Sequence, residues 1–242
     1  MTHRVRVSLA PLPDALSSPN ADNGEVIEGD SSGSDRVTKL VELGRDREAA
    51  DLATNTQGEL MDALAQLDQL GPLLGEVVSG ITSDQLDNKT PCSEFTVRGV
   101  LEHMIGGATQ FTAAFSGKEA GQPDTTDVLG SFGPTLTALA ESMHGPGALD
   151  QTINAPFGEV PADTFARFVV LDGLVHGWDM ATATGQAYAP SDALVEAVTE
   201  FASGAIPPLR DGVTFGPAVE PSPDATPIER LAALTGRQLV NQ

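Results

Sequence analysis

The chain has 242 residues, of which 40% are hydrophobic and 19% are charged. This length and composition suit one domain with a full hydrophobic core. A core of that size needs no disulfide or metal to stabilise it. Its 13 Lys and Arg residues against 34 Asp and Glu residues give a net charge of −21, which repels phosphate backbones and anionic lipid headgroups and so excludes nucleic acid and membrane surfaces as expected partners. No apolar run is long enough for a transmembrane helix, and the single cysteine, Cys92, excludes an internal disulfide.

Residues 1–52 are predicted to form a disordered or weakly helical acidic leader. Residues 1–35 are rich in Pro, Gly, Ser and Asn and lack an apolar period, and the short helical pattern at residues 36–52 is interrupted by Gly44. The start lacks the apolar core and cleavage site of a secretory signal, so we expect a cytoplasmic protein. Docking of the leader on a basic protein partner is left open. Residues 53–242 are predicted to form the folded domain.

The folded domain reads as a series of helices. Apolar residues at steps of three and four predict a helix over residues 57–81, bent at Gly71-Pro72, and Thr96 can cap the next helix, which runs to about Phe115. Further helices are predicted at residues 131–143, 163–184, 191–203 and 227–235, with a small hairpin at 152–160 and a proline-rich loop at 206–226. Several one-sided apolar stripes are buried most simply in a bundle, so we predict an all-α fold with a small hairpin, irregular insertions and short C-terminal helices.

Polar side chains interrupt the apolar face of the helix predicted at residues 163–184, for which Asp163 is the expected cap. A step of about 100° per residue places Asp172, His176 and Asp179 on the same narrow stripe as the core residues of this helix. A buried carboxylate without a partner costs several kcal/mol, and a metal ion is one partner that removes this cost. The i,i+4 spacing of Asp172 and His176 lets both side chains converge on one ion.

His103 is the predicted third ligand, because it lies at the edge of the apolar stripe on the helix that begins near Thr96. A set of His, Asp and His with open positions is typical of a catalytic metal site rather than a closed structural one. Zinc is the first choice of metal, and nickel, manganese and iron stay open because mixed nitrogen and oxygen ligands do not fix the metal. Alternatively, Asp172 and His176 hydrogen-bond each other or face water.

Other polar residues receive weaker assignments. Asp179 is the candidate for a supporting residue behind the ligands, with an ion pair to Arg98 or Arg167 as the alternative. Cys92 follows a proline at a loop-to-helix junction and is interpreted as a small packing residue rather than a nucleophile. His144 lies in a Gly/Pro loop and is expected to be solvated.

Two motifs in sequence order resemble those of DinB-like metal-binding bundles. The residues from Thr90 to His103 resemble the signature TPC-x-x-W-TVR-x-L-x-x-H, and those from Asp172 to Gln186 resemble D-x-L-V-H-G-W-D-L-A-x-A-T-G-Q. The resemblance covers roughly residues 55–238 and is to the actinobacterial branch related to the N-terminal domain of the mycothiol-dependent maleylpyruvate isomerase.

This resemblance implies a four-helix bundle with a divalent metal held by His103, Asp172 and His176. Phe95 stands where the signature has Trp, and Asp172 stands where the isomerase branch more often has Glu. The isomerase also has a separate C-terminal domain, for which the residues after Gln186 are too few. The resemblance therefore does not identify maleylpyruvate as the substrate of this chain.

The functional hypothesis is a metal-dependent transferase or isomerase that uses a small-molecule thiol. In it, the metal activates a thiol of the mycothiol type, which attacks a small electrophilic substrate. One alternative is a metal-dependent hydrolase that activates water at the same site, with Asp179 as the nearest base. Another is a non-catalytic protein that binds a metal or a small ligand. A homodimer is left open.

Overall fold

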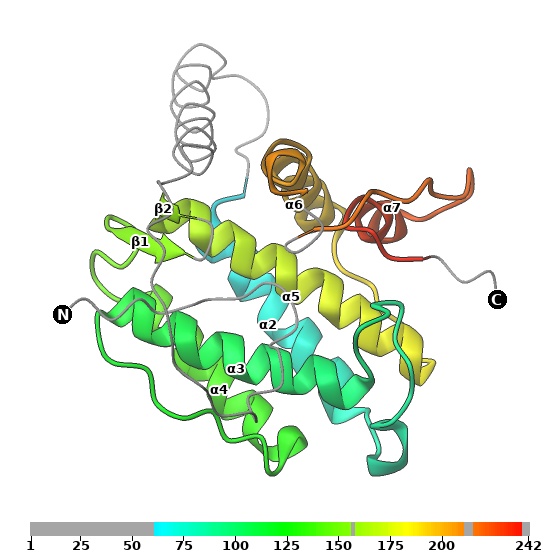
Figure 1. The fold of residues 1–242 in the computed structure, drawn as a ribbon, viewed down its shortest axis with the longest axis horizontal. Coiled ribbons are helices and arrows are strands. Elements are labelled where there is room, and N and C mark those ends of the chain that lie inside the picture. The colour runs from blue at the N-terminus through cyan, green and yellow to red at the C-terminus, as the bar shows by residue number, and fades with distance from the viewer. Residues whose placement is uncertain (1–60, 156–157, 211–214, 239–242) are drawn as a thin grey trace, which may run out of the picture.

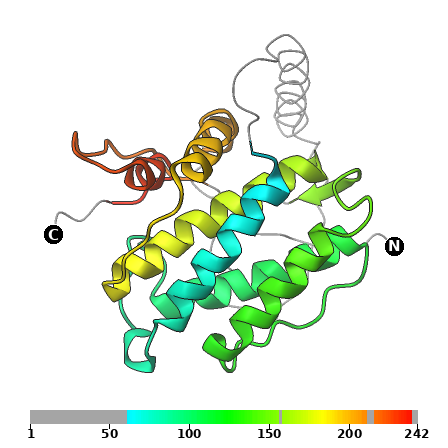
Figure 2. The ribbon, with the colours of Figure 1, turned by 180° about the vertical axis from the view of Figure 1, so that it is seen from behind.

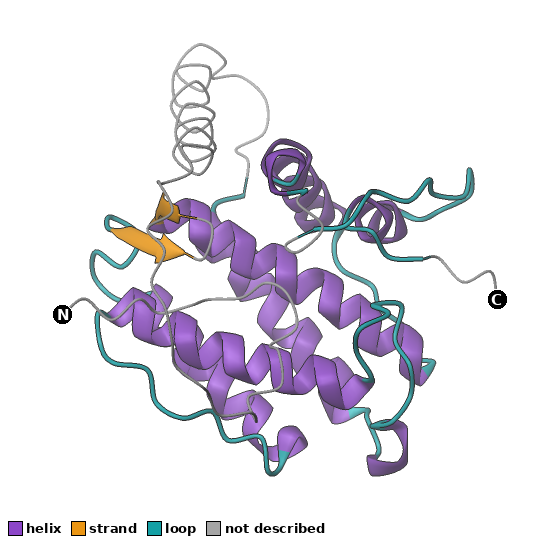
Figure 3. Ribbon diagram, in the orientation of Figure 1, coloured by secondary structure: helices purple, strands orange, loops and turns teal. Residues whose placement is uncertain are grey.

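The computed structural model describes residues 61–155, 158–210 and 215–238, which are mostly helical (Figures 1 and 3). The α-helices are α2 (Ala63–Ser79), α3 (Val97–Ser116), α4 (Val128–Met143), α5 (Ala162–Thr184), α6 (Asp192–Ala205) and α7 (Pro227–Leu234). Single 3-10 turns lie at Ser83–Gln85 and Pro207–Leu209, and β1 (Thr152–Ala155) pairs antiparallel with β2 (Gly158–Pro161).

The prediction of a largely all-α fold with a small hairpin is confirmed. The leader predicted at residues 1–52 and the first residues of the predicted domain lie outside the described residues. None of the helices in the described ranges has both the length and the hydropathy needed to cross a membrane.

Side-chain caps explain where the helices begin. The Asp62 carboxylate accepts a hydrogen bond from the Ala65 backbone N–H at 2.7 Å, and the Thr96 hydroxyl accepts one from Gly99 at 3.2 Å, as predicted for Thr96. At its other end α3 stops at Gly117, which adopts the left-handed conformation that ends many helices.

Two predicted helix starts were wrong. Helix α4 begins at Val128 rather than at residue 131, because the Asp127 carboxylate accepts a hydrogen bond from the Gly130 N–H at 3.0 Å and caps the helix earlier. Helix α5 begins at Ala162, so Asp163 lies in its first turn instead of capping it, and the Asp163 carboxylate binds Arg167 Nε at 3.0 Å.

Helices α2, α3, α4 and α5 pack side by side around the main core, with α3 against α4 and α2 against α5. Figure 2 shows α2 between α5 and α4, and α3 contacts α5 on the other side. Phe165 of α5 lies at the centre of an aromatic group, with ring centroids 5.2 Å from Phe111 and 5.7 Å from Phe115 of α3. Because α3 and α5 share this core, polar residues on their facing sides meet inside the molecule.

Glycines on α5 allow α2 to approach closely. A Cβ atom on Gly173 would lie 2.8 Å from Leu70 Cδ2, and one on Gly177 would lie 2.9 Å from Leu74 Cδ2. Both distances are too short for real contacts, so a larger residue at either position requires the neighbouring leucine side chain or α2 to move.

The end of α2 is fastened to the end of α5 by Gln186. The Gln186 side-chain amide donates a hydrogen bond to the Val77 carbonyl at 3.0 Å and another to the Thr184 hydroxyl at 2.8 Å. It fills the space that a Cβ atom on Gly80 would need. This contact fixes the two helices relative to each other along their length.

The C-terminal segment, residues 215–238, packs on the outer side of α5 together with α6 (Figure 1). The Val219 backbone N–H donates a hydrogen bond to the Ala233 carbonyl at 2.9 Å, and Arg210 Nη2 donates one to the Leu234 carbonyl at 2.7 Å. Gly236 has a φ of +96°, which favours glycine, and this turn directs the residue that follows back toward α5.

Candidate metal centre

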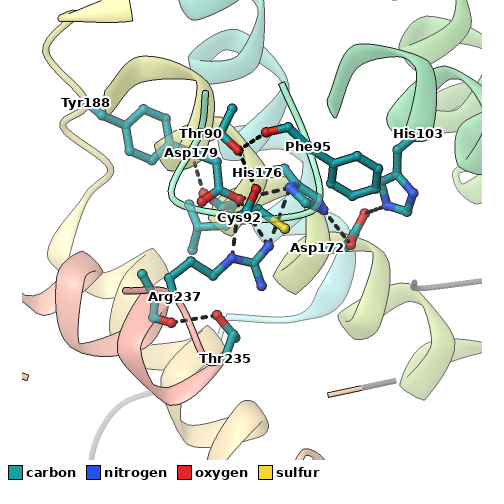
Figure 4. Close-up of polar contacts among 12 residues, drawn as sticks. Thr90, Cys92, Phe95, His103, Asp172, His176, Asp179, Tyr188, Thr235 and Arg237 are labelled. Carbon is teal, nitrogen blue, oxygen red and sulfur yellow. Dashed lines mark hydrogen bonds and ion pairs between the residues drawn. The ribbon is translucent and has the colours of Figure 1, made fainter. Parts of the chain in front are cut away.

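The three residues predicted as metal ligands lie together between α3 and α5 (Figure 4). His103 Nε2 lies 3.4 Å from Asp172 Oδ2, and His176 Nε2 lies 3.5 Å from Asp172 Oδ1. One ligand atom from each side chain falls within 4.8 Å of the other two. The i,i+4 pair on α5 and the histidine on α3 therefore converge as the helical spacing predicts.

These three side chains are nearly inaccessible to solvent. The side chains of His103, His176 and Asp172 are 6%, 3% and 16% exposed. Burial raises the pKa of Asp172, but the imidazoles of His176 and His103 outweigh it and lower that pKa to about 2. Asp172 is therefore a carboxylate at neutral pH and offers its oxygens as ligands.

The arrangement is one that can hold a divalent cation. The two nitrogen–oxygen separations, 3.4 and 3.5 Å, involve different oxygens of Asp172 and are longer than the ~2.9 Å of a normal N–H···O hydrogen bond. Each is close to the ~3.4 Å edge of a tetrahedron whose metal–ligand bonds are about 2.1 Å long. The donor set of two imidazoles and a carboxylate is one that binds zinc in proteins.

Asp179 and Arg237 lie behind His176, on the side away from Asp172 (Figure 4). His176 Nδ1 lies 3.0 Å from Asp179 Oδ2, and Arg237 donates to the same oxygen from Nη2 at 3.0 Å and from Nε at 3.3 Å. The sequence alternative that pairs Asp179 with Arg98 or Arg167 is wrong, because the guanidinium comes from the C-terminal segment.

The charged forms of Asp179 and Arg237 stabilise each other. Burial raises the pKa of Asp179, but Arg237 and His176 lower it below its ordinary value, and burial lowers the pKa of Arg237 while Asp179 raises it above its ordinary value. Since the Asp179 carboxylate can only accept hydrogen bonds, His176 Nδ1 donates to it. In a neutral imidazole this hydrogen bond places the lone pair on Nε2, the nitrogen that faces Asp172.

Phe95 forms an aromatic wall over the two histidines. Its ring centroid lies 5.3 Å from that of His103 and 5.9 Å from that of His176. The Thr90 hydroxyl donates to the carbonyls of Phe95 and Cys92, each at 2.9 Å, and so closes the loop that carries the wall. The first motif, from Thr90 to His103, thus supplies both the candidate ligand His103 and the aromatic ring of Phe95 that packs against it.

The same loop is tied to the C-terminal end of α5. The Asn88 side-chain amide donates to the Ala183 carbonyl at 2.9 Å, and that of Gln85 donates to the Thr184 carbonyl at 3.2 Å. Helix C-termini leave such carbonyls without partners inside the helix. The two sequence motifs are therefore joined directly as well as through the ligand side chains.

Cys92 lies close to the candidate site but is not part of the ligand set. The interpretation of Cys92 as a buried packing residue needs adjustment, since the residue is half-buried and interacts electrostatically with Arg237 and Asp179. Burial raises the pKa of its thiol above the ordinary 9.0. Cys92 is thus a neutral thiol at physiological pH and a poor nucleophile.

His144 lies away from the candidate site. Its side chain is 42% exposed, in agreement with the expected solvation, and its Nε2 lies 2.8 Å from Asp68 Oδ1. His144 contributes nothing to the buried cluster.

Sequence reasoning missed Arg237 as a site residue and gave no place to Phe95. The signal for Phe95 was its position inside the first motif. Arg237 lies 58 residues after Asp179, and no local periodicity connects the two. Its only signal was an arginine at the end of an apolar helix pattern, a feature that many surface helices share.

One protein family and two curated relatives are similar to this chain. Fold and site define a largely helical protein with a buried His/Asp/His cluster of the kind that binds divalent cations. The family model described as "Mycothiol maleylpyruvate isomerase N-terminal domain" matches residues 67–143, which include most of α2, all of α3 and α4, and His103. Asp172 and His176 lie beyond the matched residues, so their assignment rests on the site geometry.

Two curated relatives come from Mycobacterium tuberculosis, one from strain CDC 1551 / Oshkosh and one from strain ATCC 25618 / H37Rv, and each is named an uncharacterized protein. Each is 33% identical over 127 residues, which is 52% of this chain and 69% of the relative. The chain belongs to the mycothiol maleylpyruvate isomerase N-terminal domain family, in its actinobacterial branch. No solved structure matches the chain.

Proposed function

We propose that this protein is a metal-dependent enzyme of the thiol-using type, a transferase or isomerase whose metal site lies in a DinB-like four-helix bundle formed by α2, α3, α4 and α5. The observation that carries the proposal is the convergence of His103, Asp172 and His176 within 4.8 Å of one another in a nearly dry site. Three protein ligands leave a coordination position open, as in catalytic rather than structural zinc sites.

The charge of the site supports an anionic extra ligand. With neutral histidines, Asp172, Asp179 and Arg237 sum to one net negative charge. A divalent cation bound there would leave one net positive charge, which stabilises a thiolate over a thiol near neutral pH. The family name supports a thiol of the mycothiol type.

The thiol in this proposal comes from a small molecule and not from the chain. Cys92 is the only cysteine of the chain, and burial raises the pKa of its thiol, so the protein has no ready thiolate of its own at the site. Phe95 covers one side of the two buried histidines, which limits the competing attack of water on an electrophilic substrate there.

The alternative of a hydrolase with Asp179 as the base has less support. Arg237 lowers the pKa of Asp179, and Asp179 Oδ2 already accepts hydrogen bonds from His176 and Arg237. A carboxylate with a lowered pKa is a weak general base. Asp179 is therefore placed to orient His176 rather than to take a proton from water.

Metal content is the first test. We expect the protein purified without chelators to contain about one zinc per chain by elemental analysis, and the His176→Ala variant to contain almost none. The matched control is His144→Ala, which changes an exposed histidine and should keep the metal. Wild-type protein that stays metal-free after incubation with zinc, nickel, manganese and iron would overturn the proposal.

Thiol binding is the second test, performed on protein loaded with cobalt(II), whose spectrum reports its ligands. Addition of mycothiol should produce a new sulfur-to-cobalt charge-transfer band, and glutathione serves as the comparison thiol. No such band with either thiol, together with full metal content, would favour the hydrolase or the non-catalytic binding protein instead.

A further inference from the structure

The contacts behind the metal ligands extend from α5 to the C-terminal end of the described chain. Arg237 lies in the segment that follows α7, and it donates twice to Asp179 Oδ2, the same oxygen that faces His176 Nδ1. The Asp179 side chain is fully buried and that of Arg237 is 13% exposed. A residue 61 positions from His176 in the sequence thus lies one side chain away from it.

The position of the His176 proton decides whether this histidine is able to bind a cation. A neutral imidazole carries one proton, on Nδ1 or on Nε2, and binds a metal through the other nitrogen. His176 Nε2 faces Asp172 and the candidate metal position, so Nδ1 must carry the proton for the site to work.

Two neighbours of Nδ1 favour opposite proton positions. Asp179 Oδ2, at 3.0 Å, accepts a hydrogen bond and favours a proton on Nδ1. Arg237 Nη2, at 3.4 Å, only donates, and a hydrogen bond from it to Nδ1 would move the proton to Nε2. The contact from Nδ1 to Asp179 is shorter than the contact from Nδ1 to Arg237. The Arg237 guanidinium donates from Nε and Nη2 to the Asp179 carboxylate.

We propose that Arg237 is a positioning residue for His176: by fixing the Asp179 carboxylate against Nδ1, it keeps the imidazole in the tautomer that leaves Nε2 free for a cation. This inference rests on the proposed metal site. It makes the C-terminal segment a working part of that site, because metal affinity depends on a side chain that this segment supplies.

The backbone around Arg237 suits this role. Gly236 takes the turn with positive φ, and the Arg237 N–H donates to the Ala232 carbonyl at 3.0 Å, so the arginine is held on both its backbone and its side chain. An ion pair that only fastened the C-terminal segment to α5 would not need to share an oxygen with His176. Such a structural pair would stabilise the fold and leave metal affinity unchanged.

The test compares substitutions of Arg237 in the full chain. Arg237→Met removes the charge at similar length, Arg237→Lys keeps it, and Arg230→Met is the matched control, since Arg230 lies in the same segment and binds the Ala225 carbonyl. Zinc affinity is measured by competition with a chelating dye. We expect a loss of tenfold or more for Arg237→Met, partial rescue by Arg237→Lys, and wild-type affinity for the control.

The tautomer is read directly in the metal-free protein from the ¹⁵N chemical shifts of the His176 ring. We expect the proton on Nδ1 in the wild type. In Arg237→Met the Asp179 carboxylate is no longer fixed against Nδ1, so a share of the proton should move to Nε2, which faces the Asp172 carboxylate. The Asp179→Ala variant should shift the proton in the same direction, because it removes the acceptor at Nδ1. Far-UV circular dichroism confirms that each variant keeps its helices.

Two results would overturn the inference. One is a folded Arg237→Met variant with wild-type zinc affinity and the wild-type tautomer, which would reduce Arg237 to a structural ion pair. If that variant does not fold, a folded Arg237→Leu or Arg237→Ala protein with both wild-type properties has the same force. Wild-type protein that binds no metal would contradict the proposed function, whereas the metal-free tautomer measurement would still decide whether Arg237 orients His176.

Discussion

His144 and His176 each contact an aspartate, yet they lie in opposite environments. The His144 contact to Asp68 is the shorter one, at 2.8 Å, but the two side chains are 42% and 60% exposed. The His176 contact to Asp179 is 3.0 Å long, with side chains 3% and 0% exposed. Water competes for the first pair and not for the second, so contact length alone does not indicate a functional site.

The number of partners separates the two histidines further. His176 is surrounded by Asp172, Asp179 and Arg237, and the ring of His103 lies with its centroid 5.0 Å away. The structure gives His144 a single side-chain partner in the described residues. Burial with several converging partners makes each group costly to remove and marks the cluster as a candidate site for a cation.

The largest expected difference between the two histidines is in metal binding. His176→Ala leaves two protein ligands, which is too few to compete with water for an exchangeable cation, so zinc affinity should fall by at least 100-fold. His144→Ala should bind zinc like the wild type and lose no more than about 0.5 kcal/mol of stability. Isothermal titration with zinc checks the first value and urea denaturation the second. Equal zinc affinities would remove the distinction between the two environments.

Acid should remove the stabilisation that the Asp172 carboxylate gives the metal-free fold. The pKa of Asp172 falls from an ordinary 3.8 to about 2 in the folded chain, so Asp172 stabilises the metal-free fold above about pH 4, and this stabilisation disappears as pH falls through the folded pKa. At ~1.4 kcal/mol per pKa unit the effect is about 2 kcal/mol. The stability difference between wild type and Asp172→Asn should shrink by this amount between pH 4 and pH 2, as measured by urea denaturation.

Glycines on buried and exposed helix faces provide another contrast. Gly177→Ala places a methyl group against Leu74 and the Tyr188 hydroxyl, which donates to the Leu174 carbonyl, so we expect a loss of about 1 to 3 kcal/mol. Gly75→Ala meets no atom within 4 Å and should gain about 0.5 to 1 kcal/mol from helix propensity. Thermal unfolding measures both. A stabilised Gly177→Ala variant would show that α2 and α5 separate easily.

Cys92→Ala should have the smallest effect among the residues near the site. Removal of a half-buried sulfur costs about 1 kcal/mol of stability, and zinc content should not change because the thiol is outside the ligand group. Elemental analysis alongside chemical denaturation gives both values. A zinc content that fell with this substitution would make Cys92 a ligand.

The sequence was sufficient for the features that depend on local spacing. Thr96 marks the start of α3, and the step of about 100° per residue brings Asp172 and His176 to one face of α5 together with Asp179. His103 was found because its own helix had an equally clear apolar stripe. Each of these inferences needs only one helix and its phase.

The sequence was insufficient for features that depend on the path of the chain between elements. Arg237 reaches Asp179 only because Gly236 turns the chain back toward α5, and no helical period relates the two residues. The early start of α4 was missed because Asp127 follows other loop residues that also cap helices well. Long-range contacts of this kind are set by packing and not by propensity.

The close fit of Gln186 against Gly80 links two positions that lie far from any reacting group. Because the amide of Gln186 fills the space beside Gly80, a larger residue at position 80 is compatible with the fold only when position 186 carries a shorter side chain. Across relatives these two positions should therefore vary as a pair. The final Gln of the second motif then records an evolutionary constraint on how two helices are joined, and its presence in a newly found sequence is a sign of shared architecture rather than of shared chemistry.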